Sequence, residues 1–330
     1  RTGKEKTNVA DVVVVGSYNQ DHVWRTPRFP VPGETRLGEF SSGPGGKGFN
    51  QAIAATRQGA STAFVGASGQ DAIADAALAL GRAESIEMRI ERRMDAATGT
   101  AAILVDAQGE NLIVVGPGAN ALLSPEHIDL CAGLIGRARV LLTQHEVNPA
   151  ATRRALEHAR TAGTLTLHNP APPLAQEDGS LLDRIDVLTP NETEFSLLLS
   201  RAAAVEIPAS DLAGLSDSDL HSLCRRLRVP TLVITLGARG AFVSHDDDER
   251  RGDAQSHYRI AAEAVQPVDT TGAGDAFNGA LAAALAASPG AGFAEAVRHA
   301  NRVAALSTEA AGAALSMPTR AAVSARFPSA

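Results

Sequence analysis

The stretch "DVVVVG" at residues 11–16 places four valines in a row, and the fold prediction starts from this run. A strand with one face in water alternates apolar and polar residues, whereas this run is apolar at every position. Side chains on both faces of such a strand must be buried, as happens when helices cover both sides of a parallel sheet. The run therefore predicts a central strand of an α/β sandwich.

Short apolar runs of this kind alternate with alanine-rich segments of helical length, which is the signature of βαβ units. We therefore expect an α/β fold, a three-layer sandwich with a mostly parallel central sheet. Further strands are expected at 61–67, 138–144, 164–169, 184–190 and 231–237, and helices at 49–59, 71–81 and 150–163. Gly59, Gly81 and Gly163 are expected to mark the ends of those helices.

The composition argues for a small polar ligand. The chain has 330 residues, a net charge of -7 and 4% aromatic residues, which argues against a nucleic-acid partner. Cys131 and Cys224 lie far apart and suggest neither a disulfide framework nor a cysteine metal site. The apolar stretches are shorter than the roughly 20 residues of a membrane span. We expect a single domain over residues 1–330, no membrane partner and a cytoplasmic location.

Two stretches break the βαβ rhythm, residues 17–43 and about 97–118. The second has apolar runs on both sides of its Gln-Gly pair at 108–109, as in a β-hairpin. We expect the two stretches to form a small β-sheet that covers a site as a lid, although its edge could instead pair with a second subunit. The acidic run at 246–249 is expected to be a solvated hairpin tip.

Polar segments follow the predicted strands of the main sheet. Ligands of open α/β sheets bind outside the carboxyl ends of the strands, so polar ends that frame one crevice predict a binding site there. One such segment alone is typical of an ordinary loop. The segments are "SYNQDH" (17–22), "QHEVNP" (144–149), "HNPAPP" (168–173), "TPNETE" (189–194) and "LGARG" (236–240).

The glycine-rich stretch "SSGPGGKGFNQA" at residues 41–52 is not a Walker A loop, because Ser41 and Gly48 stand where that motif needs glycine and serine or threonine. The first strand is not followed by G-x-G-x-x-G, which argues against a dinucleotide-dependent dehydrogenase. We expect these glycines to let the backbone approach a ligand closely. Lys47 is the only lysine beyond position 6. Its compact ammonium suits a tight polar pocket, and the alternative is a surface lysine retained by chance.

The stretch "DTTGAGDAFNGALAAALAA" at 269–287 predicts a tight turn that leads into a helix. The N–H groups of Gly272, Ala273 and Gly274 at the helix start predict an anion site. Asp275 has two interpretations. It either caps the helix, or it accepts the proton of a hydroxyl that attacks a phosphate held on those N–H groups.

Phosphoryl transfer would also need a divalent metal to bridge the phosphates, and Mg²⁺ keeps several waters and few protein carboxylates. Asn191 and Glu194 lie one helical turn apart in "TPNETE" and suit such an ion, through water. The alternative for this pair is an exposed helix start.

The chain resembles the PfkB-type carbohydrate kinases, the ribokinase family, over nearly its whole length. The two family signatures are present as "GGKGFNQAIAA" (45–55) and "DTTGAGDAFNGA" (269–280), with "NQDH", "PGET", "HNPAP", "TPNETE" and "TLGARG" in the expected order. The resemblance implies a sandwich with a small β lid, ATP as donor and phosphorylation of a primary hydroxyl of a sugar.

The resemblance also assigns roles to individual residues. Asp275 would be the base, with the amides of Gly272, Ala273 and Gly274 as the anion hole. The sugar would be bound by Asn19, Asp21, Gly46, Lys47, Asn50, Glu146 and Asp275. The nucleotide would be lined by Asn191, Thr235, Leu236, Gly237, Ala238, Arg239, Gly240, Gly274 and Asn301. Asn191 and Glu194 match the family's Asn-x-x-Glu, associated with metal and phosphate, and a monovalent cation, usually K⁺, would be bound by Asp269, Thr271, Ser307, Ala310, Gly312 and Ser316.

Lid strands in this family often pair between subunits, so a homodimer is expected. This chain departs from the pattern near the predicted sugar pocket, where Tyr18 and Gln20 flank Asn19 and Phe49 replaces a small residue. Asn301 stands where relatives have histidine. The segment 202–218 is longer than usual, and the sequence assigns it no role.

The substrate interpretation has three forms. D-ribose, phosphorylated at its 5-hydroxyl, is the first. Another sugar or a nucleoside is the second, since Phe49 and Trp24 could stack on a base or exclude a ligand. A non-catalytic regulator that binds sugar or nucleotide is the third, from a different class.

Overall fold

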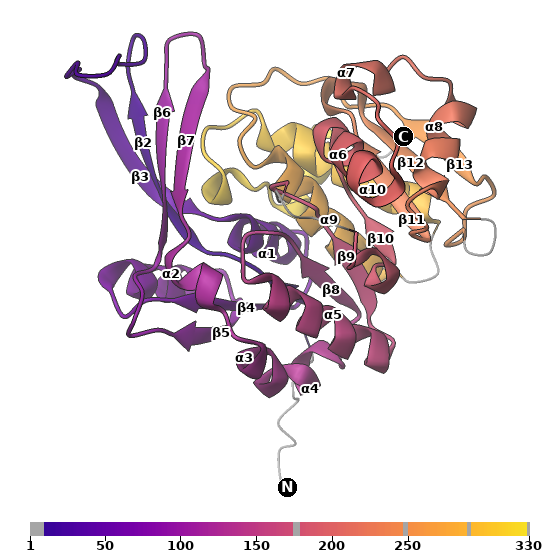
Figure 1. The fold of residues 1–330 in the computed structure, drawn as a ribbon, viewed down its shortest axis with the longest axis horizontal. Helices are drawn as coiled ribbons and strands as arrows, with labels where there is room; N and C mark the ends of the chain where they lie inside the picture. Colours follow the sequence, from indigo (N-terminus) through magenta and orange to yellow (C-terminus); the bar gives the residue numbers. More distant parts are fainter. Residues whose placement is uncertain (1–9, 174–178, 247–249, 289–291, 329–330) are drawn as a thin grey trace, which may run out of the picture.

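The protein forms a sandwich around a large sheet, and Figure 1 shows the computed structural model as a ribbon. The structure describes residues 10–173, 179–246, 250–288 and 292–328. Within these residues a nine-stranded sheet has the order β13-β12-β11-β10-β9-β8-β1-β4-β5. The strands from β5 to β11 are parallel, and β12 and β13 are antiparallel additions at one edge. The strands are β1 (Val12–Val15), β4 (Thr62–Ser68), β5 (Glu87–Arg92), β8 (Val140–Thr143), β9 (Leu165–His168), β10 (Val187–Leu188), β11 (Thr231–Thr235), β12 (Ala241–His245) and β13 (His257–Ile260).

The valine run forms β1, which lies between β4 and β8 in the interior of this sheet. Val12 and Val14 belong to the hydrophobic core on one face, and Val13 and Val15 belong to the core on the other. All four side chains are fully buried. The prediction of a parallel strand covered on both faces is confirmed.

Two layers of helices cover the sheet. Helices of the first layer share a core with Val12, and those of the second share a core with Val13. The first layer comprises α1 (Lys47–Arg57), α2 (Ala72–Ala83), α9 (Ala273–Ala287), α10 (Phe293–Ser307) and α11 (Arg320–Arg326). The second comprises α3 (Pro125–Leu130), α4 (Ala132–Ile135), α5 (Pro149–Ala162), α6 (Glu192–Ala203), α7 (Ala209–Leu212) and α8 (Asp217–Arg225). Short 3₁₀ turns are η1 (Gly118–Leu122), η2 (Leu182–Arg184), η3 (Gly237–Arg239) and η4 (Ala314–Ser316). In the described part of the chain, no helix has the length and apolar character to span a membrane.

Two of the three predicted helix ends are confirmed. Gly59 follows the end of α1 with φ of 97°, and Gly163 ends α5 in the left-handed conformation. The prediction for Gly81 is wrong, because α2 continues to Ala83. Gly81 instead lies against β5, where a side chain at this position would overlap Met88. Its small size serves packing and not helix termination.

The small sheet lies outside the main one, where Figure 1 shows it as a tall, separate ribbon. Its strands have the order β3-β2-β6-β7, and β6 and β7 form the predicted hairpin. They are β2 (Asn19–Arg25), β3 (Glu39–Gly45), β6 (Gly99–Val105) and β7 (Asn111–Gly116). The predicted hairpin tip at 246–249 lies mostly outside the described residues. The segment 202–218 contains α7, whose Leu212 is fully buried in the second core.

Helices α1 and α9 approach each other closely in the first layer. A side chain at Gly279 of α9 would overlap the carbonyl oxygen of Gln51 and the side chain of Ala54 in α1. Glycine at this position therefore allows the two helices to come into backbone contact. The same contact sets the first turns of α1 and α9 next to each other at the carboxyl ends of the strands.

Candidate active site

The carboxylate of Asp275 is buried in the first turn of α9 and receives two hydrogen bonds from α1. Asn50 Nδ2 donates to Oδ2 and Gln51 Nε2 donates to Oδ1, each at 2.9 Å. Gly272 occupies the N-cap position, and no side chain caps this helix. The helix-cap interpretation of Asp275 is therefore wrong. Burial raises the pKa of this carboxyl above its usual value, although Lys47 and the two amide donors oppose that rise.

The start of α9 presents backbone N–H groups in front of Asp275. The first i to i−4 bond of the helix runs from the N–H of Ala276 to the carbonyl of Gly272 at 2.8 Å, so the N–H groups of Gly274 and Asp275 precede helical pairing. A side chain at Gly274 would meet no atom within 4 Å, so the space before this turn is open. The N–H of Ala273 bonds to Thr270 at 3.2 Å. The N–H groups that remain available for an anion are therefore mainly those after Ala273.

Lys47 is the first residue of α1 and lies among carboxylates. Burial alone would lower the pKa of its ammonium, but Asp275, Glu146, Glu194 and Asp21 outweigh burial and raise it. Within the described chain this ammonium makes no ion pair, so its donors remain for a ligand. The prediction of a lysine in a polar pocket, and not on the surface, agrees with this position.

Glu146, in the loop after β8, secures the start of α1. Its Oε2 accepts from Ser17 Oγ at 2.5 Å and from the backbone N–H of Lys47 at 2.9 Å. Two of the nearby glycines, which were expected to bring backbone close to a ligand, also make close contacts within the fold. Side chains at Gly46 and Gly48 would overlap the backbone of residues 16–19. Glycine at these positions therefore lets the loop after β1 pack directly on α1.

The small sheet contributes Asn19 and Asp21 from β2 to the same crevice. Asn19 is buried, and its Oδ1 accepts from Asn120 Nδ2 at 2.9 Å. Asn120, in η1, also bonds to both backbone groups of Tyr18, so it fixes the entry to β2. Sequence reasoning missed Asn120, whose one signal was a polar residue in the apolar surroundings of "GPGANALL". Burial, followed by Glu146 and Asp275, raises the pKa of Asp21 to about 6.

The aromatic residues that suggested a nucleoside do not lie at the site. Phe49 is fully buried in the first core, edge to face with Tyr18 at 5.1 Å and with Phe64 at 5.5 Å. Trp24 packs on Phe40 at 5.1 Å near the outer end of β2. Neither ring is placed to stack on a ligand beside Asp275.

A cavity of about 730 Å³ opens on the other side of the anion hole, between β11, α9 and α10. Seven of the nine residues predicted for the nucleotide line it: Asn191, Thr235, Gly237, Ala238, Gly240, Gly274 and Asn301. The structure adds Phe277 of the signature at 269–280, and it adds residues outside the quoted motifs, namely the segment 262–265, Pro267, Ala304, Ala305 and Thr308. Asn301 is buried, and its Nδ2 has no partner within the described chain. This donor faces a mostly apolar cavity of suitable size for a nucleobase.

Two predicted nucleotide residues do not line this cavity. Leu236 is buried in the second core, where an apolar side chain is most stable. Arg239 is half exposed and forms an ion pair with Glu192. A run of adjacent residues in a turn points its side chains in different directions, so only some members of "TLGARG" reach the cavity.

Asn191 and Glu194 form a capping box at the start of α6. Asn191 Oδ1 accepts from the N–H of Glu194 at 2.9 Å, and Glu194 Oε2 accepts from the N–H of Asn191 at 2.8 Å. Glu194 is nevertheless buried towards the crevice, and burial raises its pKa despite the bond from Asn191 and the charge of Lys47. The helix-start interpretation is thus correct in part, because the pair caps α6 and also faces the site.

Four of the six residues predicted for a monovalent cation, Asp269, Thr271, Gly312 and Ser316, are linked by hydrogen bonds near the start of α9. Asp269 accepts from the backbone N–H groups of Thr271 at 2.9 Å and Gly312 at 3.0 Å, and Ser316 Oγ donates to the carbonyl of Gly312 at 2.7 Å. Burial would raise the pKa of Asp269, but these bonds lower it. Ser307 Oγ bonds to Ala304 within α10 and is directed into its own helix. In the described chain, no group of three His, Cys, Asp or Glu side chains could hold a metal ion.

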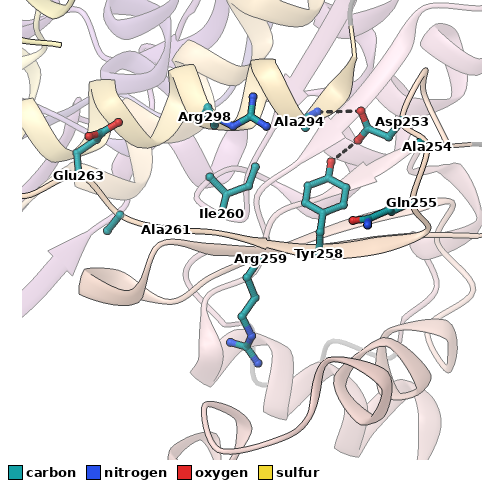
Figure 2. Close-up of a pocket in the computed structure, with 11 residues that line it drawn as sticks. Asp253, Ala254, Gln255, Tyr258, Arg259, Ile260, Ala261, Glu263, Ala294 and Arg298 are labelled. Carbon is teal, nitrogen blue, oxygen red and sulfur yellow. Dashed lines mark hydrogen bonds between the residues drawn. The ribbon is translucent and has the colours of Figure 1, made fainter. Parts of the chain in front are cut away.

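Figure 2 shows a second cavity, of about 620 Å³, between β13 and the start of α10. Its buried carboxylate, Asp253, accepts from the hydroxyl of Tyr258 and from the N–H of Ala294 at 3.1 Å. The polar groups at its inner wall thus pair with one another. Ala262 and Glu263 line this cavity and the larger one, so the two adjoin each other.

Known proteins share both the sequence and this architecture. The profile of the pfkB family carbohydrate kinases matches residues 9–320. The ribokinase of Mus musculus is 38% identical over 316 residues, which cover 95% of this chain and 94% of that protein. The structure of ribokinase from Giardia lamblia is similar with a TM-score of 0.86 and 30% identity, covering 97% of this chain and 99% of that one. Arabidopsis thaliana ribokinase complexed with ribose and ATP is similar with a TM-score of 0.81 and 28% identity, covering 98% and 100%.

The raised pKa of Asp21 predicts how Asp21→Asn changes stability with pH. The folded state binds this proton more tightly than the unfolded chain, so the contribution of Asp21 is full below its unfolded pKa of 3.8 and is lost as pH rises through about 6. The shift corresponds to at most about 3 kcal/mol. We expect Asp21→Asn to unfold at a higher temperature than the wild type at pH 7.5, with no such gain at pH 4, by scanning calorimetry. The control is Asp75→Asn, an exposed carboxylate on α2. An equal gain from Asp21→Asn at both pH values would contradict the prediction.

Proposed function

Because the chain belongs to the pfkB family of carbohydrate kinases, we propose that it is an ATP-dependent kinase that phosphorylates D-ribose on its 5-hydroxyl. The observation that carries this proposal is the position of Asp275. Its buried carboxylate lies between the sugar-side residues Asn19, Asp21 and Asn50 and the bare N–H groups at the start of α9. A base on one side of an anion hole is the arrangement that phosphoryl transfer requires.

The transfer follows from this arrangement. The ribose 5-hydroxyl would lie beside Asp275, which accepts its proton as the oxygen attacks the γ-phosphorus of ATP. The bond from that phosphorus to the bridging oxygen breaks, and ADP leaves with the electron pair. The N–H groups of Gly274 and its neighbours would stabilise the charge on the transferring phosphate, and the ammonium of Lys47, which interacts with Asp275, would assist. Orientation of the two reactants would supply most of the rate, about 7 to 11 kcal/mol.

Free hydrogen-bonding groups support the placement of both substrates. Asn50 Oδ1 is buried without a partner within the described chain, and an acceptor in this position suits a hydroxyl of the sugar. Asn301 Nδ2 is the matching free donor in the nucleotide cavity. We propose that the first binds ribose and the second binds adenine.

Two ions would complete the site. Glu194 and Asn191 would hold Mg²⁺ through water, since the capping box already engages Glu194 Oε2 and Asn191 Oδ1, and the ion would neutralise phosphate charge. K⁺ would be bound by carbonyl oxygens around Asp269, whose ionised carboxylate supplies a fixed negative charge.

We also propose a cytoplasmic location, where ATP is abundant, which cell fractionation would test.

A substrate panel tests the proposed reaction. D-ribose, 2-deoxyribose, hexoses and nucleosides would be compared by ADP release with Mg²⁺ and K⁺, and we expect the highest kcat/KM for D-ribose. Higher turnover of a nucleoside would identify the second interpretation as correct. Binding of ribose and ATP without any turnover would identify the protein as a regulator.

Replacing potassium with sodium in the same assay should lower the rate, and an unchanged rate would remove K⁺ from the proposal.

Asp275→Asn tests the assigned base. The amide keeps the shape of the side chain but accepts no proton, so kcat should fall by about 10² to 10⁴, while ATP affinity, measured by calorimetric titration, stays close to that of the wild type. Unchanged kcat would exclude Asp275 as the base.

We propose that the protein is a homodimer joined through the small sheet. Its edge strand β7 exposes Leu112, Ile113, Val114 and Val115, each at least 46% accessible. An exposed apolar edge strand is a site for pairing with another chain. Val114→Lys should therefore sediment as a monomer in analytical ultracentrifugation where the wild type sediments as a dimer. Leu130→Lys, an exposed apolar residue of α3, is the control and should stay dimeric. A monomeric wild type would refute the proposal.

A further inference from the structure

A buried chain of amide side chains lies beneath Asp275, and its central member is Gln51. This side chain is fully buried in α1, one residue after Asn50. It makes three hydrogen bonds, so every polar atom of its amide has a partner. Nε2 donates to Asp275 Oδ1 at 2.9 Å and to Asn169 Oδ1 at 3.1 Å, and Oε1 accepts from Gln144 Nε2 at 2.6 Å.

We propose that Gln51 is a positioning residue for the reaction, which holds the base at a fixed orientation relative to the sugar hydroxyl and the phosphate. This inference rests on the proposed function, because it takes Asp275 as the base. Gln51 itself would touch neither substrate. Its effect would be exerted only through the carboxylate that it holds.

The orientation of the Gln51 amide is determined by its neighbours. Asn169 Nδ2 donates to the carbonyl of Thr189 at 3.2 Å, so the oxygen of Asn169 faces Gln51 and can only accept. Gln144 presents a donor to the other side of the same amide. If the Gln51 amide were turned over, its oxygen would face both the carboxylate of Asp275 and the oxygen of Asn169. Gln51 is therefore fixed as the donor to Asp275.

The same chain reaches the anion hole by a second route. Thr189 Oγ1 donates to Asn278 Oδ1 at 2.5 Å, and Asn278 Nδ2 donates to the carbonyl of Gly274 at 2.8 Å. Gln144, Asn169 and Thr189 each follow directly after a strand, namely β8, β9 and β10. The carboxyl ends of three adjacent strands thus support both the base and the turn that holds the phosphate.

This support has a geometric and an electrostatic consequence. A displacement of about 1 Å at a reacting group can cost a hundredfold in rate. A bond donated to the ionised carboxylate also favours that form over the protonated one. The charged groups that face Asp275 are Lys47, which acts in the same direction, and the carboxylates of Asp21, Glu146 and Glu194, which act against it. Without the Gln51 donor, less would oppose the repulsion from those carboxylates, and the pKa of Asp275 would rise.

Gln51→Met tests the proposal, since methionine has similar volume but no amide. We expect kcat at neutral pH to fall about 10- to 100-fold, with KM for ATP within about twofold of wild type because Gln51 lies outside the nucleotide cavity. A hydrogen bond to a charged group is worth about one pKa unit or more. The acid limb of the pH profile of kcat/KM should therefore move up by about 1 pH unit.

Gln58→Met is the matched control. Gln58 follows the end of the same helix, seven residues after Gln51, is also buried and donates to the carbonyl of Pro318 at 2.7 Å. It should lose thermal stability as Gln51→Met does but keep the wild-type kcat and pH profile. If Gln58→Met matches Gln51→Met in kcat and pH profile, the role of Gln51 is only structural and the proposal is overturned.

Gln144→Met supplies an independent variant if Gln51→Met does not fold. It removes the donor that fixes the Gln51 amide and leaves Gln51 and Asp275 intact. A smaller decrease in kcat and a smaller shift of the same acid limb are expected, and wild-type values would overturn the proposal. If Asp275→Asn is inactive but Gln51→Met behaves like the wild type, the role proposed for Gln51 is refuted and the proposed function stands. Full activity of Asp275→Asn would refute the proposed function as well.

Discussion

The contact between α1 and α9 is the constraint on which the site depends. Glycine at position 279 lets the two backbones touch, and this closeness brings amides from α1 within hydrogen-bonding distance of Asp275. The signatures at 45–55 and 269–280 are separated by more than 200 residues of sequence and meet only through this packing. A buried carboxylate is more easily ionised when hydrogen-bond donors contact it directly. Here the carboxylate belongs to α9, and two donors come from α1.

Several carboxylates lie around that contact, and the negative charge of each one disfavours ionisation of the others. Asp21, Glu194 and Asp275 each have a pKa raised first of all by burial, and Lys47 is the cation that they share. Like charges held together in a partly dry crevice are a cost to the folded state. That cost is consistent with a site arranged for a polar, phosphate-bearing ligand and not for maximal stability.

Much of the sandwich could be predicted from residue pattern because burial on two faces leaves a simple signal. Val12 to Val15 show it in four consecutive positions. The errors share a cause, since they concern what a side chain touches across the fold. Gly81 was assigned to a helix end, whereas it allows close packing against Met88. Phe49 was assigned to the substrate side, yet it belongs to the core, because its direction is set by the rotation of α1.

The layered fold, the family and the chemical groups of the site could be inferred from the sequence alone, because strand patterns and motifs are contained in short stretches of the chain. The tertiary structure was needed to show that Asp275 is not a cap, that Leu236 and Arg239 lie outside the cavity predicted for the nucleotide, and that Gln51 donates a hydrogen bond to Asp275. The physical reason is that hydrogen-bond partners and side-chain directions depend on segments far apart in the chain. No local pattern encodes which of them come within 3 Å of each other.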